Sequence, residues 1–152
     1  MSRQFARCII VLFLVSQSRF VVGERMPGNF KAGSHTSILL VEDEVMIRMM
    51  VADMLEELGY KIAGEAGDID EGVRLVQSVD FDIAILDVNV NGKVITPVAE
   101  AVQLRGRPFV FATGYGAQGL PEKFRDRATI QKPFQIETLA RTIETVLKGI
   151  AA

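Results

Sequence analysis

Residues 83–87 read Ile-Ala-Ile-Leu-Asp, an apolar and largely β-branched run that ends directly in a carboxylate. Four apolar residues in succession are typical of a strand that is buried on both faces of a parallel sheet. In such sheets, ligands bind beyond the carboxyl ends of the strands. The run therefore predicts a buried strand that carries Asp87 to the edge of the sheet where a ligand site is expected.

Outward from this run, strand-like and helix-like segments alternate along the chain. Further strands are predicted at residues 38–41, 60–66, 108–112 and 128–131. Helices are predicted from apolar residues at helical spacing, over 47–58 before Gly59, after a capping Asp68 with Glu71 as its partner, from a capping Thr96 and Pro97 to about Leu104, and over 136–150. This alternation indicates an α/β fold, a doubly wound parallel sheet of five strands with helices on both faces.

One stretch interrupts the alternation, between the fourth and fifth strands. It reads Gly114-Tyr-Gly-Ala-Gln-Gly-Leu-Pro-Glu-Lys-Phe124 and holds three glycines and one proline. These residues leave little room for the helix that the alternation would place there. The sequence predicts a shortened or disordered fourth helix, or a loop.

Polar residues follow four of the predicted strands directly. They are Glu42 and Asp43, then Asp87, then Thr113, and finally Lys132. Because the carboxyl ends of parallel strands meet at one edge of the sheet, these side chains are expected to form a single site. The site would hold three carboxylates, one hydroxyl and one ammonium group.

Clustered carboxylates raise one another's pKa, and a hard divalent cation relieves the repulsion between them. Mg²⁺ prefers oxygen ligands, whereas zinc is disfavoured because no histidine or cysteine accompanies the acids. A carboxylate can also attack phosphorus to form an aspartyl phosphate, and phosphoryl transfer requires charge neutralisation above all. In this scheme Lys132 and Thr113 would each bind a phosphoryl oxygen.

Four short motifs in this order resemble the signature of response-regulator receiver domains. They are Val41-Glu-Asp-Glu44, Ile85-Leu-Asp87, Ala112-Thr-Gly114 and Gln131-Lys-Pro-Phe134. The resemblance extends from Ser37 to about Ala151. It implies a flavodoxin-like receiver fold and a phosphoprotein of a two-component system or phosphorelay.

The resemblance also implies the roles of the acidic residues. Asp87 would be the phosphoacceptor, and Glu42 and Asp43 would be the acidic pair that binds Mg²⁺. Asp87 and the backbone carbonyl of Asn89 would be further metal ligands. Glu42 stands where many members have aspartate, so its longer side chain would reach Mg²⁺ through a water molecule. Most members also have a proline shortly after the acceptor, and residues 88–92 contain none.

For the remaining site residues, the resemblance implies a switch. Thr113 would move toward the phosphoryl group, and Lys132 would precede a cis Lys132–Pro133 bond. Thr129 occupies the position of the usual aromatic switch residue, so Tyr115 is expected to take over the aromatic role. The stretch Pro108–Gly116 resembles alphaproteobacterial single-domain receivers with a "FATG" motif, which are associated with kinases of the HWE and related types.

The function predicted is a stand-alone signalling module and not an enzyme with a separate substrate. Phosphate would come from a sensor histidine kinase, a histidine phosphotransfer protein or acetyl phosphate, in the cytoplasm. The chain ends 20 residues after Lys132, so output would be binding of a downstream protein or competition for phosphate as a sink. The net charge of −2 disfavours nucleic-acid binding.

Two alternatives to this function stay open at this point. One is a pseudo-receiver that binds partners without phosphorylation. The intact set of Asp87, Thr113 and Lys132 argues against it, whereas the unusual Thr129 keeps it open. The other is a hydrolase with an aspartyl-phosphate intermediate. It is disfavoured because Asn89 stands where a second acid would protonate the leaving group.

Residues 1–36 differ in character from the rest and are interpreted as a flexible leader. Arg3 and Arg7 precede a short apolar run, Cys8–Val15, which is too short to form a stable membrane span. Three origins are compatible with this pattern. Translation could start at Met26, the segment could be an unstructured or weakly membrane-associated tail, or it could be a cleaved export signal.

Overall fold

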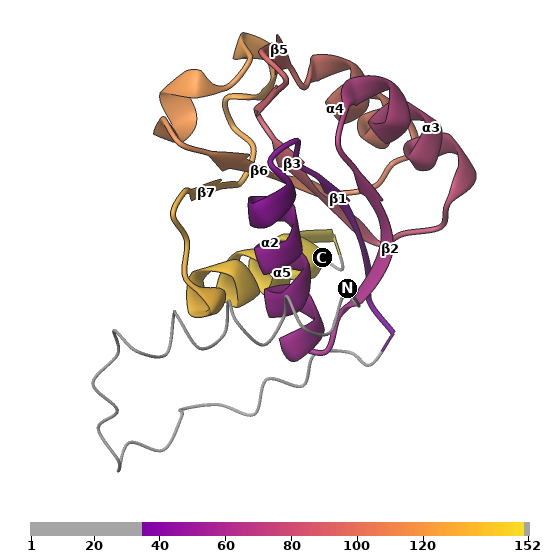
Figure 1. The fold of residues 1–152 in the computed structure, drawn as a ribbon, viewed down its shortest axis with the longest axis vertical. Helices are drawn as coiled ribbons and strands as arrows, with labels where there is room; N and C mark the ends of the chain where they lie inside the picture. The colour runs from indigo at the N-terminus through magenta and orange to yellow at the C-terminus, as the bar shows by residue number, and fades with distance from the viewer. Residues whose placement is uncertain (1–34, 151–152) are drawn as a thin grey trace. The chain divides into compact units, whose positions relative to one another are not determined.

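A sheet of five parallel strands forms the centre of the computed structural model, which describes residues 35–150 (Figure 1). The strands follow one another in space in the order β2-β1-β3-β6-β7. Their bounds are β1 Ser37–Val41, β2 Lys61–Ala66, β3 Ile83–Asp87, β6 Phe109–Thr113 and β7 Thr129–Gln131. This order reverses beside β1 and β3, which makes the sheet doubly wound. The predicted fold class is therefore confirmed.

Four α-helices in the described part of the chain cover the two faces of this sheet (Figure 1). They are α2 Val45–Glu57, α3 Ile69–Ser78, α4 Thr96–Leu104 and α5 Ile136–Ile150. Buried residues of α3 and α4 pack in one apolar cluster, and buried residues of α2 and α5 pack in another. Both faces of the sheet are therefore covered, as the unbroken apolar strands predicted.

The alternation of side chains along β1 divides its residues between the two clusters. Leu39 and Val41 face α3 and α4, whereas Ile38 and Leu40 face α2 and α5. Each of these four side chains is at most 1% exposed. Because successive residues of a strand point to opposite faces, a strand between two helical layers must be apolar throughout.

Local signals set the helix ends, with two departures from the expected pattern. The Asp68 carboxylate caps α3 by accepting a hydrogen bond from the Glu71 backbone N–H at 2.8 Å. The Glu71 carboxylate accepts from the Gly67 N–H at 3.1 Å, so the expected reciprocal bond to the cap residue itself is replaced. The prediction of Thr96 as a cap was wrong, because Thr96 is already helical and Ile95 precedes the helix.

The stretch between β6 and β7 forms two short 3₁₀ helices, η1 Gly116–Gly119 and η2 Glu122–Phe124. This confirms the shortened fourth helix. The second half of the stretch is anchored in the core, because Leu120 is 5% exposed and Phe124 is 1% exposed. The Phe124 ring packs against the rings of Phe109 and Phe111, with centroids 5.6 and 5.8 Å away. The glycine-rich half, residues 114–119, therefore lies between β6 and a segment that is anchored in the core.

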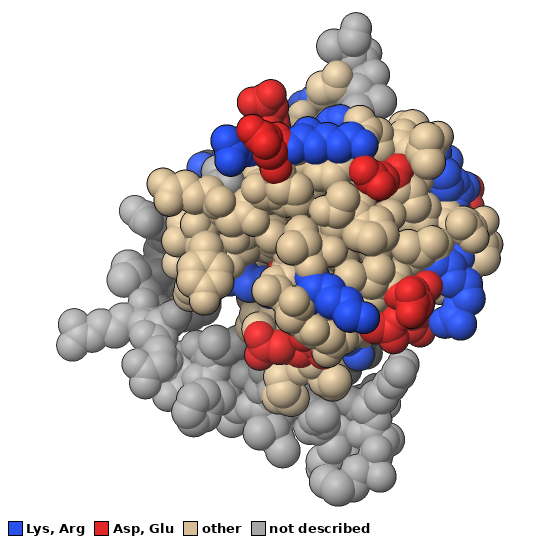
Figure 2. All heavy atoms as spheres, turned by 90° about the horizontal axis from the view of Figure 1, so that it is seen from above, with Lys and Arg blue, Asp and Glu red and all other residues tan. Residues whose placement is uncertain are grey.

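The surface carries charges of both signs. On the face shown in Figure 2, lysine and arginine side chains lie beside aspartate and glutamate side chains at several places. Among the described residues on this face, no broad area of one sign is visible. Within residues 35–150, every helix is too short or too polar to span a lipid bilayer. The interpretation of residues 1–36 as a leader lies almost entirely outside the described residues, and the boundary near residue 37 remains a prediction.

Tyr60 lies between α2 and β2 and is a titratable group within the core. Its side chain is 6% exposed and packs in the cluster beneath α2 and α5. Burial raises the pKa of Tyr60 above the usual 10.0, and the negative charge of Glu144 adds to the effect. Because the folded-state pKa lies above the unfolded one, the neutral phenol stabilises the fold fully below pH 10. This contribution is lost as the pH rises through the folded pKa.

We expect this shift to be visible in an absorbance titration. The chain has two tyrosines and no tryptophan, so a Tyr115→Phe variant reports Tyr60 alone. In the folded variant, phenolate absorbance should appear with a midpoint above pH 10. In concentrated urea the midpoint should return to about 10. Equal midpoints in the two solutions would contradict the burial of this side chain.

Candidate functional site

The centre of the site is a contact between Asp87 and Lys132. Asp87 is the last residue of β3, and Lys132 directly follows β7. The Lys132 Nζ atom lies 2.8 Å from the Asp87 Oδ2 atom. The other carboxylate oxygen of Asp87 accepts a hydrogen bond from the Asn89 backbone N–H at 3.2 Å. The backbone N–H of Lys132 donates to the Thr113 carbonyl at 2.8 Å, which places the end of β7 beside the end of β6. The fold therefore brings together residues 45 positions apart, as predicted.

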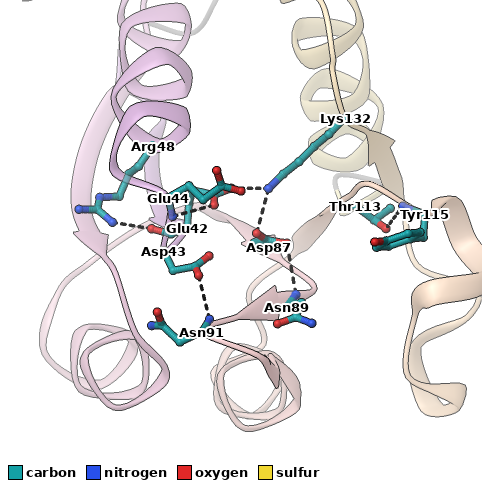
Figure 3. A network of polar contacts seen from close by, with 10 residues as sticks. All are labelled: Glu42, Asp43, Glu44, Arg48, Asp87, Asn89, Asn91, Thr113, Tyr115 and Lys132. Atoms are coloured by element: carbon teal, nitrogen blue, oxygen red, sulfur yellow. Dashed lines mark hydrogen bonds and ion pairs between the residues drawn. The ribbon is translucent and has the colours of Figure 1, made fainter.

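Glu42 reaches the same ammonium group from the end of β1 (Figure 3). Its Oε2 atom lies 2.5 Å from Lys132 Nζ, and its Oε1 atom accepts from the Glu44 N–H at 3.1 Å. The Glu42 residue is 2% exposed, so its charge is removed almost completely from water. Lys132 therefore bridges two carboxylates, Glu42 and Asp87, that would otherwise repel each other.

The electrostatic consequences differ for the two partners. Burial raises the pKa of Glu42, and the nearby charge of Asp87 raises it further, while the hydrogen bond from Lys132 opposes both effects. For Lys132, burial alone would lower the pKa. Its hydrogen bonds to Asp87 and Glu42 outweigh burial and raise the pKa above the usual 10.5. Lys132 is thus held in its charged form, while burial and the charge of Asp87 disfavour the charged form of Glu42.

Asp43 lies at the rim of the site and is held from a different direction. Its Oδ2 atom accepts a hydrogen bond from the Asn91 backbone N–H at 2.9 Å. Asn91 belongs to the turn of a small antiparallel hairpin, β4 Asn89–Val90 and β5 Lys93–Val94. Asn91 and Gly92 have φ values of 53° and 75°, as a two-residue type I′ hairpin turn requires. The residues directly after Asp87 therefore form a hairpin whose turn contacts Asp43.

The three carboxylates form a group that has the chemistry of a magnesium site. One oxygen each from Glu42, Asp43 and Asp87 lies within 4.8 Å of the others. Carboxylate oxygens are the ligands that Mg²⁺ prefers, together with water and phosphate oxygens. The donor set therefore fits Mg²⁺. Both Glu42 oxygens accept hydrogen bonds from the protein, and a contact of Glu42 with Mg²⁺ through water stays a prediction.

Thr113 ends β6 and is 2% exposed. Its hydroxyl accepts a hydrogen bond from the Tyr115 N–H at 3.0 Å and donates to the Gly116 carbonyl at 3.3 Å. The hydroxyl is therefore part of the turn that begins the glycine-rich stretch. The Tyr115 side chain itself is 88% exposed. The role of Tyr115 as a substitute for the aromatic switch residue stays a prediction.

The structure also places the remaining predicted residues. The Lys132–Pro133 peptide bond is cis, as expected. Thr129 begins β7, and its side chain is half-buried. It pairs with Phe111 of β6, whereas Thr113, two residues further along β6, pairs with Gln131. The predicted part of Thr129 in a switch is not tested by this arrangement.

Arg48 is a site residue that the sequence pattern did not indicate. It lies in the first turn of α2, and its Nη1 atom donates to the Glu42 carbonyl at 2.5 Å. Its Nε atom lies 3.7 Å from a carboxylate oxygen of Glu65. The guanidinium group thus holds the backbone carbonyl of Glu42, the first residue of the acidic pair. Arg48 and Glu42 are six positions apart, across the loop between β1 and α2, and no regular spacing of residues predicts this contact.

Three comparisons with known proteins agree with this geometry. The family model described as the response regulator receiver domain matches residues 38–144. The transcriptional regulatory protein PdtaR of Mycobacterium tuberculosis is 40% identical over 111 residues, which are 70% of this chain and 54% of PdtaR. The chemotaxis protein CheY of Thermotoga maritima is 27% identical over 118 residues, 73% of this chain and 97% of CheY. The chain thus spans about half the length of PdtaR.

Solved structures show the same similarity. The solution structure of SdrG from Sphingomonas melonis Fr1 has a TM-score of 0.67 and 42% identity, and the match covers 75% of this chain and 98% of SdrG. The crystal structure of the response regulator PhyR from Brucella abortus has a TM-score of 0.65 and 25% identity, over 77% of this chain and 49% of PhyR. In sequence and in fold, the match covers the part of the chain that holds the acidic site.

Proposed function

This chain belongs to the response regulator receiver domain family of two-component systems, and on that premise we propose that it accepts a phosphoryl group on Asp87. Receiver domains of this kind are signalling modules. The observation that supports the proposal most strongly is the position of the Asp87 carboxylate, which contacts the Lys132 ammonium group and clusters with two further carboxylates at the edge of the sheet. The donor would be a phosphohistidine of a sensor histidine kinase, or a small acyl phosphate.

In the proposed step, a carboxylate oxygen of Asp87 attacks phosphorus. The bond between phosphorus and the donor's histidine nitrogen breaks, and that nitrogen keeps the electron pair. Asp87 is 8% exposed, so electrostatic interactions act more strongly there than in water. Lys132 would leave the Asp87 Oδ2 atom and follow the phosphoryl oxygens, which carry more negative charge than the carboxylate they replace.

Mg²⁺ would supply the remaining positive charge when bound. We propose Glu42, Asp43, Asp87 and the backbone carbonyl of Asn89 as the groups that hold it. Two observations support this set, namely the cluster of carboxylate oxygens within 4.8 Å and the excess of negative over positive charge around Lys132. Burial is the main reason for the raised Glu42 pKa, and the charge of Asp87 adds to it, so a divalent cation would also relieve this repulsion.

The signal would leave the site through Thr113. To donate its hydrogen bond to a phosphoryl oxygen, the hydroxyl must give up the Gly116 carbonyl. The stretch from Gly114 to Gly119 would then change its preferred conformation, while Leu120 and Phe124 keep the next part fixed. We propose that a partner protein reads this change, or that the domain acts as a phosphate sink. The "FATG" stretch supports an HWE-type kinase as the donor.

Phosphorylation by acetyl phosphate tests the proposal and its metal requirement together. In the presence of Mg²⁺, the intact mass of the protein should rise by one phosphoryl group. With excess EDTA the gain should disappear, because the three carboxylates then repel the incoming phosphoryl oxygens. Restoring Mg²⁺ in excess over EDTA should restore the gain. A gain that is equally large with and without EDTA would contradict the metal requirement.

A protein that is not phosphorylated under any condition would contradict the proposed function and not only its metal requirement. If the folded protein gains no mass from acetyl phosphate with Mg²⁺, and also accepts none from a phosphorylated histidine kinase, the proposal fails. The pseudo-receiver interpretation would then replace it, and its acidic cluster would be a remnant without a phosphoryl role. The half-buried Thr129 in β7, where an aromatic residue was expected, is the feature that favours this second candidate.

A further inference from the structure

The β4–β5 hairpin holds two carboxylates that come from different strands (Figure 3). The Asn91 N–H donates to Asp43 Oδ2 at 2.9 Å, and the Asn89 N–H donates to Asp87 Oδ1 at 3.2 Å. These two donors lie two residues apart on one short element. The hairpin therefore fixes the position of Asp43 relative to Asp87, although the two acids are 44 residues apart in the sequence.

The side chain of Asn91 attaches the tip of this hairpin to the main sheet. Its Nδ2 atom donates to the Gly67 carbonyl at 3.0 Å. Gly67 follows β2 directly and is itself held, because its N–H donates to the Glu71 carboxylate at 3.1 Å. A Cβ atom at Gly67 would lie 3.0 Å from the Nη1 atom of Arg48, so this corner is also closely packed. The turn is thus joined to a well-fixed point of the fold.

Asparagine meets two requirements at this position. The backbone φ of 53° lies in the left-handed region, which asparagine tolerates better than most residues. Its short amide also reaches the Gly67 carbonyl. Glycine would keep the turn but lose the amide, and alanine would lose the amide and add backbone strain. These two substitutions therefore separate the conformation of the turn from the attachment of its tip.

We propose that Asn91 is a positioning residue that sets the geometry of the acidic cluster and gives the site its preference for Mg²⁺ over Ca²⁺. This inference rests on the proposed Mg²⁺ site. Mg²⁺ demands a nearly ideal octahedron of ligands at short distances, whereas Ca²⁺ accepts irregular coordination. An Asp43 carboxylate that the hairpin holds in one orientation suits the first ion. An Asp43 that turns freely would still attract both ions by its charge, but would lose the advantage for Mg²⁺.

The test compares the binding of both ions to the full chain by isothermal titration calorimetry. Asn91→Gly keeps the backbone N–H that donates to Asp43 but loses the amide that fixes this N–H in place. We therefore expect Mg²⁺ to bind about tenfold more weakly, the lower end of the effect of disturbing the hydrogen-bonding surroundings of a metal ligand. The affinity for Ca²⁺ should change by a clearly smaller factor. Asn91→Ala should weaken Mg²⁺ binding at least as much as Asn91→Gly.

Val94→Thr is the matched control, because Val94 is 52% exposed on the same hairpin and the substitution keeps a β-branched residue of similar size. It should leave both affinities unchanged. Thermal melting without ions should show that all variants remain folded at the temperature of the titration, so that a change in affinity is not a change in folding.

Two results would overturn the inference alone, with Mg²⁺ binding intact in the natural sequence. One is an Asn91→Gly variant that binds Mg²⁺ as tightly as the natural sequence. The other is an equal loss for Mg²⁺ and Ca²⁺, which would show that Asn91 does not act on geometry. If the natural sequence binds no Mg²⁺ at all, the proposed function fails and this inference fails with it.

Discussion

Replacement of Asp87 by asparagine is expected to abolish phosphorylation by acetyl phosphate while leaving the fold intact. The amide has nearly the same size and can still accept the hydrogen bond from the Asn89 N–H, but it is not a nucleophile toward phosphorus. Removal of one of three clustered charges should not unfold the domain. Intact mass spectrometry measures the uptake, and circular dichroism confirms the fold.

Asp126→Asn is the matched control for this substitution, because it makes the same chemical change at an exposed residue between η2 and β7. Its uptake of phosphate should equal that of the natural sequence. An Asp87→Asn variant that still gains a phosphoryl group would show that another side chain is the acceptor. The neighbouring carboxylates Glu42 and Asp43 would then be the first to examine.

Replacement of Lys132 by methionine is expected to lower the free energy of unfolding by about 3 kcal/mol at neutral pH without Mg²⁺. Methionine fills a similar volume but leaves Glu42 and Asp87 without the cation that bridges them. The Lys132 pKa is raised in the fold, so the stabilising charge is fully present at pH 7 and is lost only when the pH rises through that pKa. Urea unfolding at pH 7 measures the change.

Two further variants test whether the loss of stability in Lys132→Met comes from the lost contacts with Glu42 and Asp87. Lys148→Met removes an exposed lysine that pairs only with Glu144 one turn earlier in α5, and should have little effect on stability. The double substitution Lys132→Met with Glu42→Gln should recover part of the lost stability, because one of the two unpaired charges is gone. A single Lys132→Met variant as stable as the natural sequence would contradict the bridging role.

Much of the fold could be predicted from the sequence because its three central strands, β1, β3 and β6, are buried on both faces. An unbroken apolar run as short as residues 83–86 is typical of a strand between two helical layers, and a polar residue directly after it marks the edge of the sheet. The positions of Asp87 and Thr113 follow from the same rule, whereas Lys132 follows the less apolar strand β7. The glycines between β6 and β7 correctly indicated a shortened helix, because glycine destabilises the interior of a helix.

Contacts that depend on two distant segments could not be predicted in the same way. The Glu42 carboxylate contacts Lys132, which lies 90 residues away in the sequence, and no local pattern predicts this pair. Arg48 lies only six residues from Glu42, but its contact with the Glu42 carbonyl crosses the loop between β1 and α2 and follows no regular spacing. Contacts of this kind can be identified only in the folded structure, where the ends of the strands lie side by side.

The hairpin after Asp87 is a different case, because a local signal was present. Asn91-Gly92 is a favoured pair for a two-residue type I′ turn, and Val90 and Lys93 flank it as hairpin partners. The hairpin itself was not predicted, and its strands are only two residues long, too short to show an alternation of side chains. Its importance lies in what it contacts, namely Asp43 through Asn91, which the turn signal alone does not reveal.

The most direct test of the central claim is to locate the phosphoryl group itself. Borohydride reduces an aspartyl phosphate to homoserine, so treatment after phosphorylation by acetyl phosphate and Mg²⁺ marks the acceptor permanently. Peptide mass spectrometry should find homoserine at position 87 and at no other aspartate. Reduction at Asp43, or a gain of phosphate with no reducible aspartate, would contradict the assignment of Asp87 as the phosphoacceptor.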